Sequence, residues 1–202
     1  MDTAAIILTG GRSSRFDGRH TPGIEIAGSP VIASLLTTVE AVGAGEIVVC
    51  GSSAGIDAGM LTRLLLVDEE PAFGGPLHGI GCALAALPTG ERIILVLAGD
   101  MPAISASLLA RLRESSAAGS PAAAVDPSGR VQFLCAAWPE AVLRDAVAGL
   151  GSAVGLPVKA LYRDREITLI PATEAELIDI DTPADLDRAE QITDAEQDSG
   201  AD

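Results

Sequence analysis

The chain has 202 residues, enough for one sizeable α/β core, and we expect a single domain over residues 1–192. Its formal net charge of −15 has the wrong sign for binding nucleic acid or an anionic membrane, so we expect neither partner. Three widely spaced cysteines without a C-x-x-C pair indicate neither a disulfide framework nor a zinc site. No basic leader and no apolar stretch of roughly 20 residues is present, so we expect a cytoplasmic protein.

The first half of the chain alternates short apolar runs with stretches of helical period, which predicts an α/β domain with a mostly parallel sheet. The expected strands are Ala4–Thr9, Glu46–Cys50, Leu64–Val67 and Ile93–Ala98. Helices are expected between them, from Val31 to Val42 and from Pro76 to Leu87. Ser105 is expected to cap the next helix.

The second half predicts further strands at Ala122–Val125, Phe133–Trp138, Ile167–Ile170 and Leu177–Ile180, with a helix from Pro139 to Leu150. Thr182, Pro183 and Asp185 form a typical helix start, with an N-cap, a proline at the first position and an acid at the third. From Thr193 the sequence is polar and acidic, so residues 193–202 are expected to form a disordered tail.

A glycine-rich loop, Leu8-Thr9-Gly10-Gly11-Arg12-Ser13-Ser14-Arg15, follows the first expected strand. Two glycines let backbone N–H groups approach a phosphate with no Cβ in the way. Arg12 and Arg15 add positive charge, and Arg19 and His20 follow shortly after. The loop therefore predicts binding of a nucleoside triphosphate, although an ordinary strand-to-helix turn uses similar residues. It is neither a P-loop nor a dinucleotide fingerprint, because G-K-[ST] and G-x-G-x-x-G are absent.

Carboxylates follow several expected strands. Asp100 comes directly after a buried strand, at the edge of the sheet where ligands bind in open α/β folds. A carboxylate there suits Mg²⁺ bridging phosphate oxygens, although an aspartate that only caps a turn or helix is the alternative. Asp68 and Asp181 also follow expected strands, and the first is suited to a base or ribose. The convergence of these acids and the glycine loop on one edge favours a ligand site.

The motifs and their order resemble the molybdenum cofactor guanylyltransferase family (MobA-like NTP transferases). The glycine loop is similar to the family's L-x-G-G-x-S-x-R signature, and the similarity covers about residues 4–190. Three later segments match family motifs in the right order: Val67-Asp68-Glu69 with Gly75-Pro76-Leu77, Ala98-Gly99-Asp100-Met101-Pro102, and Asp179-Ile180-Asp181-Thr182-Pro183-Ala184-Asp185-Leu186.

The resemblance implies a Rossmann-like, three-layer αβα fold of the nucleotide-diphospho-sugar transferase type. It implies Mg²⁺-dependent transfer of GMP from GTP to a phosphorylated acceptor such as molybdopterin, with release of pyrophosphate. Arg15 and Asp100 would be catalytic, and Asp100 and Asp181 would hold the metal. The implied nucleotide-binding residues are Leu8, Thr9, Gly10, Gly11, Arg12, Arg19, Thr21, Asp68 and Gly75.

One departure from the family pattern affects catalysis. The family has a lysine where this sequence has Thr21, and Lys159 is the only lysine in the chain. Loss of a cation that neutralises phosphate charge in the transition state lowers the rate, so a catalytically impaired nucleotide-binding homologue is one alternative. A cytidylyl- or sugar-nucleotide transferase of the same fold is another, and a domain that binds a different phosphate ester is a third. Phe133 and Trp138 are expected in the core rather than stacked on a pterin.

Overall fold

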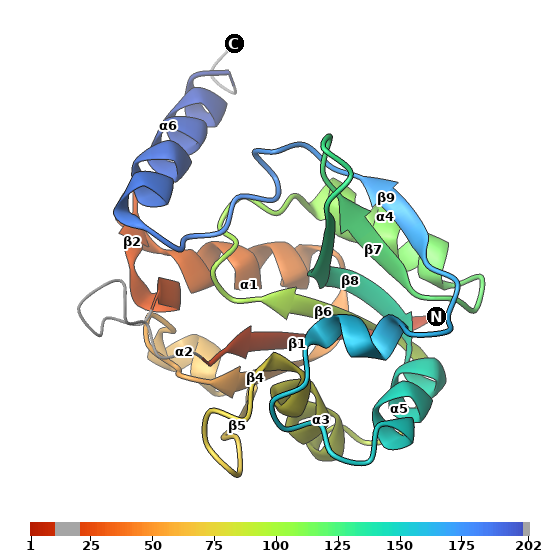
Figure 1. Cartoon of the computed structure of the whole chain (residues 1–202). Helices are drawn as coiled ribbons and strands as arrows, with labels where there is room; N and C mark the ends of the chain where they lie inside the picture. Colours follow the sequence, from red (N-terminus) through yellow and green to blue (C-terminus); the bar gives the residue numbers. More distant parts are fainter. Residues whose placement is uncertain (11–20, 200–202) are drawn as a thin grey trace.

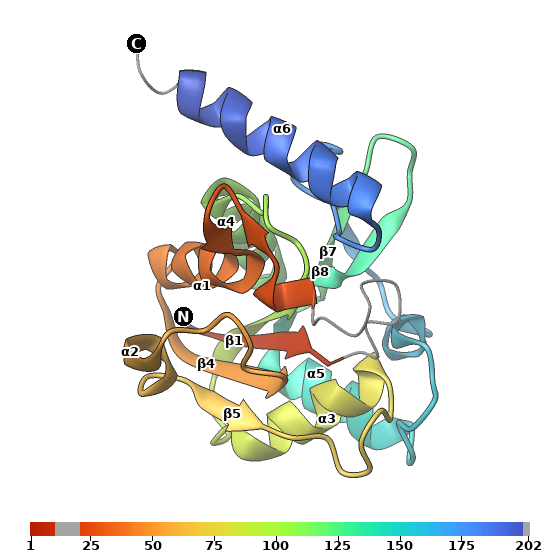
Figure 2. The same cartoon turned by 90° about the vertical axis from the view of Figure 1, so that its left-hand side faces the viewer.

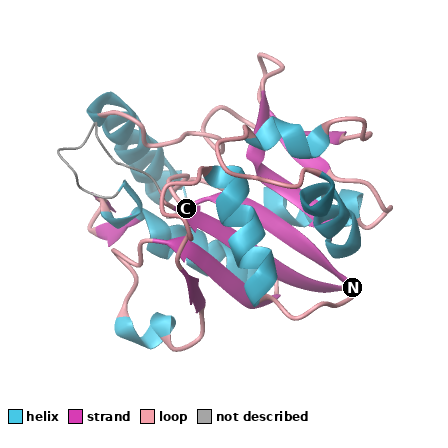
Figure 3. Cartoon of the chain, turned by 60° about the horizontal axis from the view of Figure 1, so that its bottom comes forward, coloured by secondary structure: helices cyan, strands magenta, loops and turns pink. Residues whose placement is uncertain are grey.

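A central sheet between two layers of helices forms the body of the computed structural model, which describes residues 1–10 and 21–199, with side chains up to Ile192 (Figures 1 and 3). The central sheet consists of β1 (Asp2–Thr9), β4 (Ala44–Gly51), β5 (Leu65–Val67), β6 (Arg92–Ala98), β7 (Ala122–Val125), β8 (Val131–Pro139) and β9 (Thr168–Pro171). Within the described residues its strand order is β5-β4-β1-β6-β8-β7-β9. This confirms the expected three-layer α/β fold.

The remaining elements are a short hairpin, helices and 3-10 turns. A short hairpin is formed by β2 (Glu25–Ile26) and β3 (Ser29–Pro30). The helices are α1 (Val31–Ala41), α2 (Ala58–Leu61), α3 (Pro76–Ala86), α4 (Ala106–Ser116), α5 (Glu140–Gly149) and α6 (Pro183–Ser199), with 3-10 turns η2 (Thr21–Gly23) and η3 (Val158–Tyr162). No helix in the described part of the chain is long and apolar enough to span a membrane.

The four strands β5, β4, β1 and β6 are parallel, and their register brings their carboxyl ends together. Thr9 at the end of β1 lies opposite Gly51 of β4, and Leu8 lies opposite Ala98 of β6. Strand β8 is antiparallel to both β6 and β7. It follows β7 through a tight turn at Asp126, whose N–H donates to the Arg130 carbonyl at 3.1 Å. The loops after β1, β4, β5 and β6 therefore share one edge.

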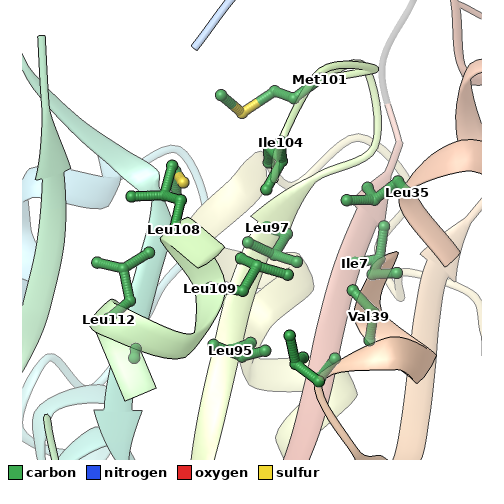
Figure 4. Close-up of a cluster of buried hydrophobic side chains, with 14 of the residues drawn as sticks. Ile7, Leu35, Val39, Leu95, Leu97, Met101, Ile104, Leu108, Leu109 and Leu112 are labelled. Carbon is green, nitrogen blue, oxygen red and sulfur yellow. The ribbon is translucent and has the colours of Figure 1, made fainter. Parts of the chain in front are cut away.

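Alternation along the buried strands separates the core into two layers. Ile7 of β1 and Leu95 of β6 face α1 and α4, in the cluster of aliphatic side chains shown in Figure 4. Ile6 of β1 and Val96 of β6 point to the opposite face, which α3, α5 and η3 cover. Both faces of the central strands are buried, as their continuous apolar runs predicted.

The predicted strand at Leu177–Ile180 is wrong. This segment is irregular, and Ile180 N–H donates to the Asp100 carbonyl at 3.0 Å instead of joining a ladder. Its apolar residues are buried because Ile178 and Ile180 pack with Ile26 and Val31 beneath the start of α6. A buried irregular segment therefore has the same apolar sequence pattern as a buried strand.

The two predicted helix caps at Ser105 and Thr182 are present. Ser105 Oγ accepts from Leu108 N–H at 3.0 Å at the start of α4. Thr182 Oγ1 accepts from Asp185 N–H at 3.4 Å, and the Asp185 carboxylate accepts from Thr182 N–H at 2.8 Å. Helix α6 leads away from the layers (Figure 2) and continues to Ser199, past the expected start of the tail at Thr193. Residues 193–199 contain no glycine or proline that would end it.

Candidate functional site

A cleft of about 650 Å³ opens at the carboxyl edge of the parallel strands. Its volume is in the range of small-molecule sites. Predicted site residues from three separate segments line it: Leu8 and Gly10 at the end of β1, Asp68 and Gly75 between β5 and α3, and Asp100 after β6. The structure thus brings together side chains that are far apart in the sequence, as the strand-end argument predicted.

Close packing between strand ends fixes where the glycine loop begins. Gly99 N–H donates to the Leu8 carbonyl at 2.8 Å, which ties the end of β1 to the turn after β6. Gly51 has a φ of +115°, and a Cβ there would lie 2.5 Å from Gly10 N. Thr9 does not line the cleft: its buried hydroxyl donates to the Cys50 carbonyl at 3.2 Å and holds β1 against β4.

Glu69, which the sequence prediction did not include among the site residues, links two walls of the cleft. Its Oε2 accepts from Gly74 N–H at 3.0 Å, within the segment that joins β5 to α3. Its Oε1 lies 2.9 Å from the position of a Cβ on Gly10. A side chain at position 10 would therefore displace this carboxylate, which gives Gly10 a packing reason to be glycine in addition to phosphate access.

Asp100 lies at the junction of this cleft and a second one. Burial, followed by the negative charges of Asp179 and Asp181, raises the pKa of its carboxyl to about 6. The second cleft, of about 550 Å³, shares Asp100 with the first and is also lined by Asp179, Arg130 and Phe133. Asp181, the predicted second metal ligand, is exposed and lines neither of these two clefts.

The two aromatic residues considered for pterin stacking differ in burial. Trp138 is fully buried, and its Nε1–H donates to the Tyr162 hydroxyl at 3.2 Å, so it is a core residue as predicted. Phe133 packs on Tyr162 with ring centroids 4.7 Å apart, but it is only partly buried. One part of Phe133 therefore belongs to the core and another part to the wall of the second cleft.

Residues 5–168 match the family model of the MobA-like NTP transferase domain. The chain belongs to the MobA-like NTP transferase family. It is therefore a nucleotidyltransferase by family, and the resemblance found in its motifs is confirmed. A curated relative, the molybdenum cofactor guanylyltransferase of Rhizobium meliloti, is 30% identical over 198 residues, which cover 92% of this chain and 89% of the relative.

Solved structures share the fold across MobA-like and related nucleotidyltransferases. A nucleotidyl transferase from Methanothermobacter thermautotrophicus has a TM-score of 0.75 at 23% identity, covering 94% of this chain and 96% of that one. The 4-diphosphocytidyl-2C-methyl-D-erythritol synthase of Anaerococcus prevotii has a TM-score of 0.72 at 18% identity, covering 96% of each chain. Because the second is named for a cytidyl product, the fold alone does not select the base.

The cationic part of the MobA-like signature is outside the described residues. The predicted site residues Gly11, Arg12, Arg15 and Arg19 all lie in residues 11–20, which the structure does not describe. Thr21, at the family's lysine position, begins η2 directly after this stretch. Its neighbour Pro22 lies against the turn before Asp100, since a Cβ on Gly99 would be 3.5 Å from Pro22 Cγ. Position 21 is therefore one residue from a proline that contacts this turn.

The donors near Asp100 fit a metal that substrate oxygens help to bind. In the part of the chain that the structure describes, no group of three or more His, Cys, Asp or Glu side chains could hold a metal. Mg²⁺ is commonly bound by only one or two carboxylates, with water and phosphate oxygens completing its shell. Asp100, with the charges of Asp179 and Asp181 acting on it, suits that arrangement.

Proposed function

We propose that this protein is a Mg²⁺-dependent guanylyltransferase that transfers GMP from GTP to the phosphate of molybdopterin and releases pyrophosphate. The observation that carries the proposal is the position of Asp100, which lines both clefts. GTP would occupy the first cleft, beside Gly10 and Asp68, and the acceptor would occupy the second. The guanylyl assignment is supported by the Rhizobium meliloti relative, which is named a molybdenum cofactor guanylyltransferase and matches 92% of this chain.

The chemistry joins the two clefts. An oxygen of the acceptor phosphate attacks the α-phosphorus of GTP, the bond from that phosphorus to the bridging α–β oxygen breaks, and pyrophosphate leaves. Mg²⁺ would neutralise charge on the phosphate oxygens, and Asp100 would hold it there. Backbone N–H groups of the glycine loop and the Arg15 guanidinium would balance the remaining charge. Positioning and electrostatic stabilisation therefore supply the catalysis, without a covalent enzyme intermediate.

The two clefts carry side chains of opposite charge that suit the two proposed substrates. A carboxylate only accepts hydrogen bonds, so Asp68 in the first cleft matches the N1–H and amino donors of guanine. Arg130 in the second cleft is a cation that suits an anionic acceptor. Phe133, in the wall of the same cleft, offers an aromatic surface for a planar ring.

The proposal is tested by measuring the binding of GTP, ATP, CTP and UTP by calorimetry, with and without Mg²⁺. We expect GTP to bind most tightly and Mg²⁺ to strengthen its binding. A preference for a pyrimidine nucleotide would rule out the guanylyl assignment and favour a cytidylyl- or sugar-nucleotide transferase. If no nucleoside triphosphate binds at millimolar concentration with Mg²⁺, the assignment of the glycine loop to triphosphate binding is wrong.

A catalytically impaired homologue is the second candidate function, and Thr21 favours it. We expect Thr21→Lys to raise the rate of pyrophosphate release from GTP and acceptor by at least about tenfold, because an ammonium near the phosphates stabilises charge in the transition state. The matched control is Thr21→Met, a long side chain without charge, which should leave the rate unchanged. Equal rates for Thr21→Lys and the wild type would show that the missing lysine does not limit the reaction.

A further inference from the structure

An exposed aromatic ring stands at the first cleft. Phe73 is 63% exposed and lies in the segment between β5 and α3. The described part of the chain has six large hydrophobic side chains that are strongly exposed: Met1, Leu65, Leu66, Phe73, Val154 and Leu169. Of these, Phe73 lines the first cleft. Leaving so much apolar surface in water is unfavourable, which suggests that a ligand covers the ring.

The backbone at Phe73 adopts a conformation that bulky residues rarely take. Its φ is +60°, in the left-handed region, where a side chain with a Cβ is strained. Such strain persists where the surrounding structure holds it, and it is concentrated at ligand sites. The conformation at Phe73 therefore adds a second, independent reason to assign this residue to a binding site.

Three hydrogen bonds fix the segment that carries the ring. Glu69 Oε2 accepts from Gly74 N–H at 3.0 Å, directly after Phe73. The Gly74 carbonyl accepts from Gly155 N–H at 2.8 Å, and the Glu70 carbonyl accepts from His78 Nε2 at 2.9 Å. Because these contacts bracket Phe73 on both sides, its backbone is held in place before a ligand arrives, which lowers the entropy cost of ordering this segment on binding.

We propose that Phe73 is the stacking platform for the base of the bound nucleotide, an inference that rests on the proposed function of the first cleft. Asp68, which lines the same cleft, would contact the edge of the base while Phe73 covers its face. An edge contact and a face contact together fix the orientation of a planar ring. Stacking grows with overlap, so a purine gains more from Phe73 than a pyrimidine does.

The test compares ligands with and without a base on the full-length protein. Calorimetry with Mg²⁺ measures the Kd of GTP, CTP and inorganic tripolyphosphate for the wild type, Phe73→Ala and Phe73→Tyr. We expect Phe73→Ala to weaken GTP at least about fivefold, the lower end of base–aromatic stacking, and to leave tripolyphosphate unchanged. Phe73→Tyr should bind GTP within about twofold of the wild type, because it keeps the ring.

Leu169→Ala is the matched control, because Leu169 is 47% exposed on β9 at the far edge of the sheet. It should change none of the three affinities. Unchanged GTP binding by Phe73→Ala would overturn the stacking role, and so would an equal loss for GTP and tripolyphosphate. If the wild type prefers CTP, the guanylyl proposal and the purine preference fail. Weaker CTP binding by Phe73→Ala with unchanged tripolyphosphate binding would still support the stacking role. If the wild type binds tripolyphosphate but no nucleotide, both proposals are wrong.

Discussion

Replacing Asp100 with asparagine is expected to lower Mg²⁺-dependent turnover by at least about 100-fold, the loss seen when one stabilising group is removed from a transition state. Asparagine has nearly the same shape but no charge, so it should fail to hold Mg²⁺ at the junction of the two clefts. Pyrophosphate release from GTP and acceptor measures turnover, and calorimetry measures GTP binding. Mg²⁺ should strengthen GTP binding to the wild type, whereas the variant should bind GTP equally with and without it.

The same substitution is expected to stabilise the metal-free protein. The folded-state pKa of Asp100 is about 6, above its ordinary 3.8, so folding favours the protonated form. The free energy of unfolding therefore falls as pH rises from about 4 to about 6, and this loss remains at neutral pH. The Asp100→Asn variant has no such loss, because an amide does not titrate. The Tm gain of the variant over the wild type should be larger at pH 7 than at pH 4, where the wild-type carboxyl is mostly protonated.

Asp187→Asn is the control for both arms, because Asp187 is exposed on α6, away from the clefts. It should change neither the Mg²⁺ dependence nor the Tm. Asp100→Asn with normal turnover would exclude Asp100 as the metal-holding residue. A Tm gain in Asp100→Asn without a loss of activity would mean that the destabilising burial of this carboxylate serves no function.

The parallel half of the fold could be predicted because its strands are buried on both faces. Ile93–Ala98 is apolar throughout, and only a central strand between two helix layers accommodates such a run. The second half was harder, because burial there does not always mean a strand. Leu177, Ile178 and Ile180 are all buried, yet their backbone is irregular. A hydrophobic pattern records which side chains avoid water, and it does not record the backbone that carries them.

In the site, too, the residues at strand ends could be predicted and those that depend on loop conformation could not. Gly10, Asp68 and Asp100 could be predicted to meet, because the carboxyl ends of parallel strands share one edge. Glu69 and Phe73 could not, because their positions depend on how one loop folds. Glu69 accepts from Gly74 N–H within the segment between β5 and α3, and Phe73 lines the cleft from a backbone with positive φ. The one available signal was a phenylalanine in a glycine-rich loop, which has no periodicity to place it.

Glu140→Ala is expected to lower the free energy of unfolding by about 3–5 kcal/mol, the loss typical of breaking a buried ion pair. Glu140 is 1% exposed at the start of α5. Its Oε1 accepts from Arg144 Nε at 2.6 Å and from Gly90 N–H at 3.2 Å, and Arg92 Nε lies 2.8 Å from Oε2. Arg144 in turn donates to carbonyls at the end of α3. Removing the carboxylate would therefore leave two arginines without their shared partner where α3, α5 and β6 meet.

Urea unfolding followed by circular dichroism measures this loss, with extrapolation to water. The matched control is Asp145→Ala, which removes the Arg165 pair at 2.7 Å, where the carboxylate is 80% exposed. That surface pair should contribute less than about 1 kcal/mol, because water and salt screen it. Glu140 lines neither cleft, so a folded Glu140→Ala protein should still bind GTP. A loss below about 1 kcal/mol for Glu140→Ala would mean that this ion pair gains no more than its desolvation costs.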